Sequence, residues 1–255
     1  MIILIGIWGV IMNDNIKRAF LFDCPIDLVT YEKVLSCTDS WILNNDPKTR
    51  LIFAQNPEKV MTSLENKELN KALNQADILI PDGNGVVWAL KKQGYKLEGR
   101  VTGIDLMHKL LKQAQQLSVG VYILGGKEHV VKKAVDKIKE DYPNITISGY
   151  HNGYFHDTEK IISDINSSKA SILFTALGSP KQELFLTEHV NKLSVNVSMG
   201  IGGSLDVISG EVKRAPKWAQ NLKLEWFYRI VTDPKRMKRG LKIPKFIVKV
   251  LFKSH

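Results

Sequence analysis

One carboxylate of the chain is placed to act as a general base. Asp82 lies in the turn Pro81-Asp82-Gly83, directly after the apolar run 78–80 and before the apolar stretch 86–90. The turn also has an ordinary structural explanation, because Asp is favoured there for hydrogen bonding to its own backbone. Loops at strand ends nevertheless carry function unusually often. Asp82 is therefore the candidate to take a proton from an attacking hydroxyl group.

Three polar residues in two further segments are candidates for the same site. Asn56 precedes a proline and so fits a helix N-cap, with proline at the first helical position. Thr102 fits the N-cap of a helix that runs to Leu111, and Arg100 lies just before that helix. Caps and solvated arginines are common, so each residue has a purely structural alternative. If the preceding runs are parallel strands, Asn56, Arg100 and Thr102 lie near Asp82 at one edge of a sheet.

The segment 178–183 (GSPKQE) has two compatible interpretations. Ser179 and Gln182 match the S-x-x-Q capping box, with Pro180 at the first helical position. A helix N-terminus that begins with glycine after a strand is also an anion site, because its free N–H groups and the helix dipole favour phosphate. Gln182 is therefore a candidate for ligand binding as well as for capping.

Short apolar runs that alternate with helical stretches position these segments. The expected strands are residues 50–54, 78–80, 119–124, 146–148, 171–176 and 195–199, and helices are expected from residues 57, 128 and 180. This alternation predicts an α/β fold with a mainly parallel sheet flanked by helices. With 255 residues, of which 44% are hydrophobic, the chain is long enough for one large domain with a small appendage.

Several familiar signatures are missing from the sequence. There is no G-x-x-x-x-G-K-[ST], no G-x-G-x-x-G and no D-x-D motif, and the six histidines have no ligand spacing. The nearest acidic pair, Asp157 and Glu159, is better explained by Asp157 as a helix cap. Cys24 and Cys37 form no C-x-x-C pair, which favours a reducing cytoplasm. We expect neither a metal nor another cofactor.

The positive charge is concentrated at the C-terminal end of the chain. The formal net charge is +10, and residues 229–255 carry nine Lys or Arg against one acid. Lys242, Lys245, Lys249 and Lys253 share a sector of about 80° on a helix that turns about 100° per residue, and apolar residues fill the rest. This pattern is typical of a helix lying in a membrane interface and suits anionic lipid, although the same apolar surface could pack on the domain or on another subunit.

The first twelve residues, MIILIGIWGVIM, are apolar. The run is too short for a spanning helix, which needs about 20 residues. It also lacks the basic start and cleavage site of a signal peptide. It is either a buried strand or translated upstream sequence with the start at Met12, and the polar stretch 13–18 favours the second interpretation. The expected organisation is an α/β catalytic domain over 13–212 and a helical appendage over 213–255.

Taken together, the segments resemble the WecG/TagA/CpsF family of bacterial glycosyltransferases (glycosyltransferase family 26). The resemblance covers nearly the whole chain after residue 20, and the ordered set is more specific than any one piece. The matching stretches are 56–59 (NPEK), 76–77 with 81–86 (AD, PDGNGV), 100–106 (RVTGIDL), 178–183 (GSPKQE), 200–203 with Asp206 (GIGG), and 212–217 with 224–229 (VKRAPK, LEWFYR).

The resemblance implies a Rossmann-like α/β domain of the GT-E type and an inverting, metal-independent reaction. The implied reaction moves an N-acetylmannosamine-type sugar, or its uronic acid, from UDP to polyprenyl-diphosphate-linked N-acetylglucosamine in cell-surface polysaccharide or teichoic acid synthesis. Asp82 corresponds to the family's base, and Asn56, Arg100 and Gln182 to its polar site residues. Three appendage arginines correspond to those thought to close over the UDP diphosphate: Arg229, Arg236 and Arg239. Members often have Thr two residues before the Asn, whereas this chain has Ala54.

This interpretation is consistent with the chemistry of the residues. An inverting transferase needs one base, and arginines with a helix N-terminus can stabilise the leaving UDP without a metal. The expected partners are a UDP-sugar, a lipid-linked acceptor and the anionic inner face of the cell membrane, with no nucleic acid. The sequence leaves open a homo-oligomer and another donor such as UDP-glucose. A Rossmann-type oxidoreductase should show G-x-G-x-x-G, and a nucleic-acid-binding protein should interleave aromatic residues with its basic ones, so both are remote alternatives.

Overall fold

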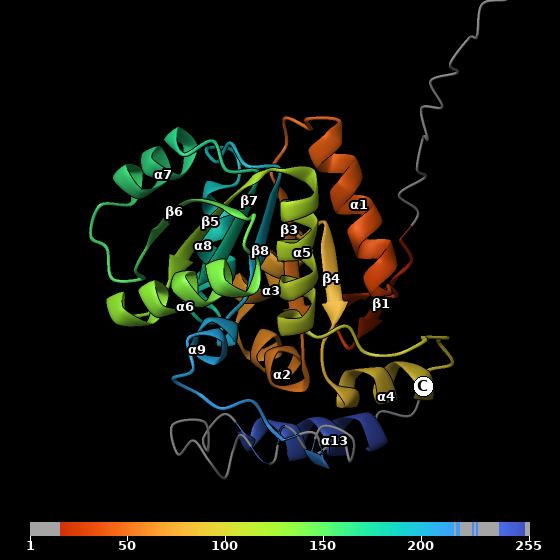
Figure 1. Cartoon of the computed structure of the whole chain (residues 1–255). Helices are drawn as coiled ribbons and strands as arrows, with labels where there is room; N and C mark the ends of the chain where they lie inside the picture. The colour runs from red at the N-terminus through yellow and green to blue at the C-terminus, as the bar shows by residue number, and fades with distance from the viewer. Residues whose placement is uncertain (1–15, 217, 220–225, 227, 229–239, 253–255) are drawn as a thin grey trace, which may run out of the picture.

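The computed structural model describes residues 16–216, 218–219, 226, 228 and 240–252. Its centre is a parallel sheet of six strands in the order β4-β3-β8-β7-β5-β6. The strands are β3 (Arg50–Gln55), β4 (Ile78–Pro81), β5 (Gly120–Gly125), β6 (Thr146–His151), β7 (Ile172–Ala176) and β8 (Val197–Gly200). The expected Rossmann-like α/β fold is confirmed (Figure 1).

Helices cover both faces of this sheet, because the strand side chains alternate between two hydrophobic cores. On one face, Leu51, Phe53 and Leu79 pack with α2 (Pro57–Glu65), α3 (Lys67–Asn74), α7 (Thr158–Ser167) and α8 (Lys181–His189). On the other face, Ile52 and Ile80 pack with α1 (Tyr31–Leu43), α5 (Gly103–Leu117), α6 (Glu128–Asp141) and α9 (Ser204–Ile208).

A two-stranded antiparallel ribbon lies beside the β4 edge of the sheet. It consists of β1 (Arg18–Leu21) and β2 (Cys24–Asp27). The Asp27 carboxylate accepts a hydrogen bond from the Leu79 backbone N–H at 2.8 Å, which joins the ribbon to β4. Neither this ribbon nor α1 was expected from the sequence.

Two helices lie across the end of the molecule at which the strands finish. α4 (Asn84–Lys92) follows β4 after Asp82 and Gly83. α13 (Lys242–Phe252) packs against α2 and the core that contains Leu51, Phe53 and Leu79 (Figure 1). Phe246 is fully buried and Val250 nearly so. One side of α13 therefore belongs to the hydrophobic core, so the alternative of packing on the domain holds for that side.

The six expected strands are all present, each within three residues of the expected ends. The expected N-caps at Asn56, Thr102 and Asp157 are confirmed, because each side chain accepts a hydrogen bond from a backbone N–H of the first turn. The interpretation of the first twelve residues concerns a part of the chain outside the described residues.

Candidate active site

The candidate site lies at the carboxyl edge of the sheet, where Asn56 follows β3 and Asp82 follows the neighbouring strand β4. The Asp82 backbone N–H donates to the Gln55 carbonyl oxygen at 2.8 Å, which extends the pairing of the two strands by one residue. Gly83 has a φ of 104°, and a Cβ atom there would lie 3.8 Å from the Asn56 Cβ. The structure therefore brings Asn56 and Asp82 side by side.

The N-terminus of α5 orients the Asp82 carboxylate. The backbone N–H of Gly103, the first residue of α5, donates to Asp82 Oδ2 at 3.4 Å. The free N–H groups of a helix start and its dipole favour a negative charge at this position. A Cβ at position 103 would lie 3.7 Å from both Asp82 Oδ2 and the Ala54 Cβ, so a glycine keeps space open around the carboxylate.

Thr102 is held in place by residues that the sequence analysis did not single out. Its backbone N–H donates to the Tyr31 hydroxyl at 2.8 Å, and its own hydroxyl donates to Asp105 Oδ2 at 2.7 Å. Arg214 forms a two-pronged ion pair with Asp105, at 2.9 and 3.1 Å. Burial raises the pKa of Asp105, but the hydrogen bonds from Arg214 and Thr102 lower it by more, so the pKa lies below the ordinary value. Burial likewise raises the pKa of Tyr31.

The Arg214–Asp105 pair connects two parts of the chain. Arg214 lies near the expected start of the appendage, and Asp105 lies in the helix start that orients Asp82. Arg214 comes one residue after the expected boundary, whereas Asp105 is in the first turn of α5. Arg100 is half-buried, and its charge is close enough to contribute to the lowered pKa of Asp105. Arg100 therefore lies near the same edge, as expected.

Asn56 caps α2 and still offers hydrogen-bond donors to a ligand. Its Oδ1 accepts from the Lys59 backbone N–H at 2.8 Å. The amide oxygen is therefore fixed by the helix, and the Nδ2 group is the part of this side chain that can donate to an acceptor on a substrate. The structural and functional interpretations of Asn56 are compatible.

The capping box expected at Ser179 and Gln182 is wrong. α8 begins at Lys181 with Pro180 as its N-cap, and no side chain caps it. Gln182 is instead 3% exposed; its Oε1 accepts from the Gly202 backbone N–H at 3.0 Å, and its Nε2 donates to Glu183 Oε1 at 3.0 Å. Gly202 is twenty residues away and follows β8, so a distant loop uses the polar groups that a local cap would need.

A buried ion pair lies beside Gln182. Lys59 Nζ donates to Glu183 Oε1 at 2.6 Å, and the two residues are 7% and 0% exposed. Both are in the matching stretches, NPEK and GSPKQE, but no signal in a single sequence pairs them. The positions of Arg229, Arg236 and Arg239 lie outside the described residues.

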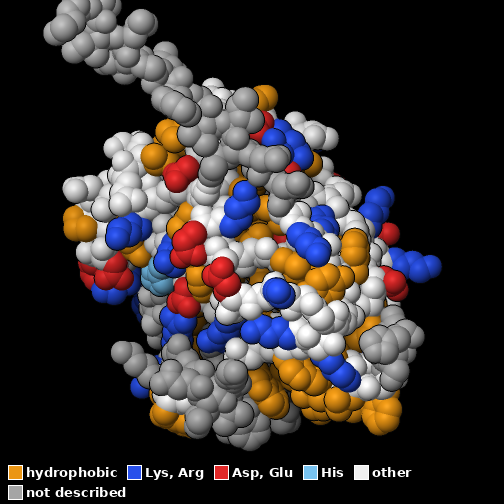
Figure 2. Space-filling view, turned by 90° about the vertical axis from the view of Figure 1, so that its right-hand side faces the viewer, with side chains coloured by type: hydrophobic (Ala, Val, Ile, Leu, Met, Phe, Trp, Pro, Cys, Tyr) orange, Lys and Arg blue, Asp and Glu red, His pale blue; other side chains and the backbone are white. Residues whose placement is uncertain are grey.

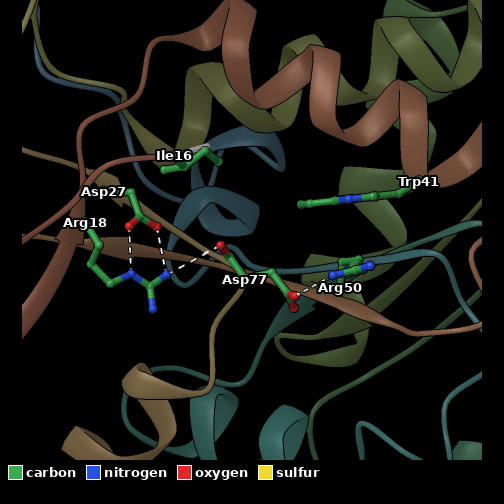
Figure 3. Close-up of a pocket in the computed structure, with 6 residues that line it drawn as sticks. All are labelled: Ile16, Arg18, Asp27, Trp41, Arg50 and Asp77. Atoms are coloured by element: carbon green, nitrogen blue, oxygen red, sulfur yellow. Dashed lines mark hydrogen bonds and ion pairs between the residues drawn. The ribbon is translucent and has the colours of Figure 1, made fainter. Parts of the chain in front are cut away.

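A separate cavity of about 240 Å³ opens at the opposite, amino edge of the sheet, between Arg18, Asp27, Trp41, Arg50 and Asp77 (Figure 3). Its charges are satisfied by one another: Arg18 holds Asp27 through two hydrogen bonds at 2.7 and 2.9 Å, and Arg50 pairs with Asp77 at 3.1 Å. The Arg50 guanidinium also lies over the Trp41 ring. This neutral cluster ties the starts of the strands together and offers a ligand no unpaired charge.

Within the described part of the chain, no three His, Cys, Asp or Glu side chains are grouped closely enough to hold an ion.

Comparison with known proteins shows which family the chain belongs to. Residues 19–255 match the model of the glycosyl transferase WecG/TagA/CpsF family. An N-acetylglucosaminyldiphosphoundecaprenol N-acetyl-beta-D-mannosaminyltransferase of Bacillus spizizenii is 39% identical over 204 residues, which cover 80% of this chain and 79% of the relative. The Staphylococcus aureus (strain NCTC 8325 / PS 47) protein of the same name is 32% identical over 239 residues, covering 93% and 94%. The chain belongs to the WecG/TagA/CpsF family of glycosyltransferases.

Proposed function

We propose that the chain transfers N-acetylmannosamine from a UDP donor to N-acetylglucosamine linked to a polyprenyl diphosphate, with inversion at the anomeric carbon. The observation that carries the proposal is the Asp82 carboxylate, held by the α5 N-terminus at the carboxyl edge beside Asn56. The relatives are named as N-acetylmannosaminyltransferases that act on N-acetylglucosaminyldiphosphoundecaprenol, which supports the choice of donor sugar and acceptor.

In this mechanism Asp82 removes the proton from the attacking hydroxyl of N-acetylglucosamine. The hydroxyl oxygen forms the new bond to the anomeric carbon, while the bond from that carbon to UDP breaks on the opposite face. The electron pair of the broken bond leaves with UDP, and the proton stays on Asp82. The Asn56 amide donates to an acceptor atom of the bound sugars and so holds the reacting centres in line.

In the proposed complex the donor nucleotide binds next to the glycine-containing loops at the centre of the carboxyl edge of the sheet. The connection from β7 leads to β8 and the connection from β5 leads to β6, in opposite directions along the sheet. Such a switch point is the usual binding crevice of an open parallel sheet. Gly125 ends β5 with a φ of 134° and Gly126 follows it with 67°, whereas Gly178 lies after β7 with a φ of 77°. A Cβ at Gly178 would meet nothing within 4 Å, so this glycine leaves open space in which a diphosphate can approach the backbone N–H groups at the start of α8. Gly126 instead ties this edge together, because its N–H donates to the Ala176 carbonyl oxygen at 3.2 Å.

The diphosphate charge that develops on leaving UDP is stabilised by arginines and helix N-termini, without a metal. Arg100, half-buried near the edge, supplies one positive charge. Arg229, Arg236 and Arg239 of the appendage, which lie outside the described residues, supply the others. The absence of a D-x-D motif from the sequence supports this reaction type.

The enzyme works as a peripheral protein on the inner face of the cell membrane, bound through α13. The outward side of this helix exposes Ile247, Val248, Leu251 and Phe252, and the exposed Lys245 and Lys249 lie beside them. In Figure 2, hydrophobic side chains gather at the end of the molecule that carries α13, with Lys and Arg side chains next to them. No helix in the described residues has the length and hydropathy needed to cross a bilayer.

The deciding experiment incubates the purified protein with a short-chain prenyl-diphosphate-N-acetylglucosamine and a panel of UDP-sugars, with products identified by mass spectrometry. We expect a single added N-acetylhexosamine from UDP-N-acetylmannosamine. Transfer from UDP-glucose or from a uronic acid donor, with none from UDP-N-acetylmannosamine, would replace the proposed donor. No transfer from any UDP-sugar would refute the reaction class.

A further inference from the structure

A buried carboxylate, Glu183, lies under the candidate site and belongs to no step of the mechanism above. It is 0% exposed and sits in the first turn of α8. One oxygen, Oε1, accepts from both Lys59 Nζ at 2.6 Å and Gln182 Nε2 at 3.0 Å. The other oxygen, Oε2, has no hydrogen-bond partner among the residues that the structure describes. A buried oxygen without a partner costs stability, so the pair is a poor arrangement for stability alone.

Glu183 determines which way the Gln182 amide faces. With its Nε2 donating to Glu183, the amide turns its Oε1 to the Gly202 backbone N–H, 3.0 Å away. The opposite orientation would set an amide oxygen against the carboxylate and an NH₂ group against the N–H of Gly202, which are two repulsive contacts. The carboxylate therefore fixes the hydrogen bond that Gln182 makes to the loop after β8.

The end of β8 and the loop after it leave room for the Gln182 amide. A Cβ at Gly200 would lie 2.7 Å from Gln182 Nε2, so a side chain there would displace the amide. Gly202 adopts a φ of 51°, which favours glycine. The β8 strand is central in the sheet, between β3 and β7, so its exit loop lies between the loops that carry Asn56 and Gly178.

Lys59 compensates the buried charge of Glu183 and connects it to the part of the site that contains Asn56 and Asp82. A buried charge without a partner is strongly unfavourable, and the ammonium group supplies that partner. The backbone N–H of Lys59 is also the group that Asn56 caps, at 2.8 Å. The ion pair thus joins the first turn of α2, next to Asn56 and Asp82, to the first turn of α8.

We propose that Glu183 is a positioning residue, which holds the Gln182 amide on the Gly202 N–H and so shapes the β8 exit loop for the substrates. Lys59 neutralises it and keeps the α2 and α8 starts in register. The effect on transfer rests on the proposed function, whereas the effect on the loop does not.

The test compares two double variants that both remove the charges. Lys59→Met with Glu183→Gln keeps a carbonyl oxygen that can accept from Gln182. Lys59→Met with Glu183→Leu keeps apolar volume but no acceptor. Replacing a buried ion pair by apolar residues is often neutral or stabilising, and the glutamine is neutral and keeps the hydrogen bond from Gln182, so we expect both variants to melt close to the parent. We expect the glutamine variant to keep kcat/KM within about threefold and the leucine variant to lose at least about tenfold, the loss of one hydrogen bond of ordinary strength.

Amide hydrogen exchange at Gly202 provides a measurement that needs no sugar. We expect exchange at least about tenfold faster in the leucine variant than in the glutamine variant, at equal global stability. Gln182→Met, with the ion pair intact, should show the same loss of protection and the same drop in transfer. Equal protection and equal transfer in the two double variants, or full protection in Gln182→Met, would overturn the positioning role.

If the leucine variant does not fold, Glu183→Met in the same background replaces it, because methionine adapts to irregular gaps. The same outcomes then decide. A parent enzyme that transfers no sugar would refute the proposed function alone, since the exchange measurements would still decide the role of Glu183.

Discussion

The outward side of α13 gives the most direct test of membrane attachment. Val248 and Leu251 are three residues apart and so share a face, and they are 53% and 48% exposed. Phe246 and Val250, which hold the helix on the domain, are buried on another face. Changing Val248 and Leu251 together to Gln therefore removes apolar surface from the outside while leaving the packed side of the helix in place.

The exposed fractions set the size of the effect. Burying a whole Val or Leu side chain is worth ~1.5–3 kcal/mol, so the exposed halves contribute about 1 kcal/mol each when they enter the lipid interface. The pair is worth about 2 kcal/mol, which corresponds to roughly a 30-fold change in partitioning. The lysines beside them add an electrostatic contribution that salt weakens.

The assay is sedimentation with anionic vesicles, read as the bound fraction against lipid concentration. Leu43→Gln is the matched control: Leu43 is 68% exposed, but it ends α1, away from α13 (Figure 1). We expect the control to bind like the parent and the double variant to need roughly 30-fold more lipid, with equal melting temperatures, because exposed substitutions change stability little. A shift below about threefold would refute the membrane role of this face.

Three further predictions concern the reaction. Asp82→Asn keeps an oxygen for the Gly103 N–H but cannot take a proton, so the folded variant should lose at least about a hundredfold in turnover; near-normal turnover would remove Asp82 from the mechanism. Activity should survive excess EDTA; loss that magnesium or manganese reverses would show that a metal takes part. Arg236→Lys and Arg239→Lys should keep vesicle binding but lose transfer, because a guanidinium binds diphosphate oxygens in a fixed fork that lysine lacks. Lysine variants that turn over like the parent would limit both arginines to membrane charge.

Much of the sheet could be predicted because its strands are short apolar runs between helices. Within the run 50–54, residues 51–53 are buried and their side chains point to both faces of the sheet, so the hydrophobicity of these residues marks the strand. The β1–β2 ribbon could not be found in this way. Its strands have four residues each, and it is held by Asp27 bonding to Leu79, fifty-two residues away.

Some residues of the candidate site could likewise be predicted from the sequence, and others could not. Asn56 and Thr102 were predictable because helix capping is a local interaction, and Asp82 because it ends a strand. Gln182 shows the limit: it satisfies the spacing of a capping box, yet its amide bonds to Gly202 and Glu183 instead. The pairing of Lys59 with Glu183, 124 residues apart, arises only when the sheet order places α2 near α8.

The proposed membrane contact and the proposed base are joined by one short helix. α4 begins two residues after Asp82, and at its far end Lys92 Nζ lies 3.4 Å from the Val250 carbonyl oxygen in the last turn of α13. The start of α4 also approaches α13, because a Cβ at Gly85 would lie 3.7 Å from the Phe246 ring. Asp82 therefore lies at a shallow depth below the helix that is proposed to meet the lipid. The sugar of a lipid-linked acceptor is held at a membrane surface by its diphosphate, and it cannot travel far from that surface. Attachment through α13 with Asp82 at this depth lets the acceptor hydroxyl reach the base while the prenyl chain stays in the bilayer.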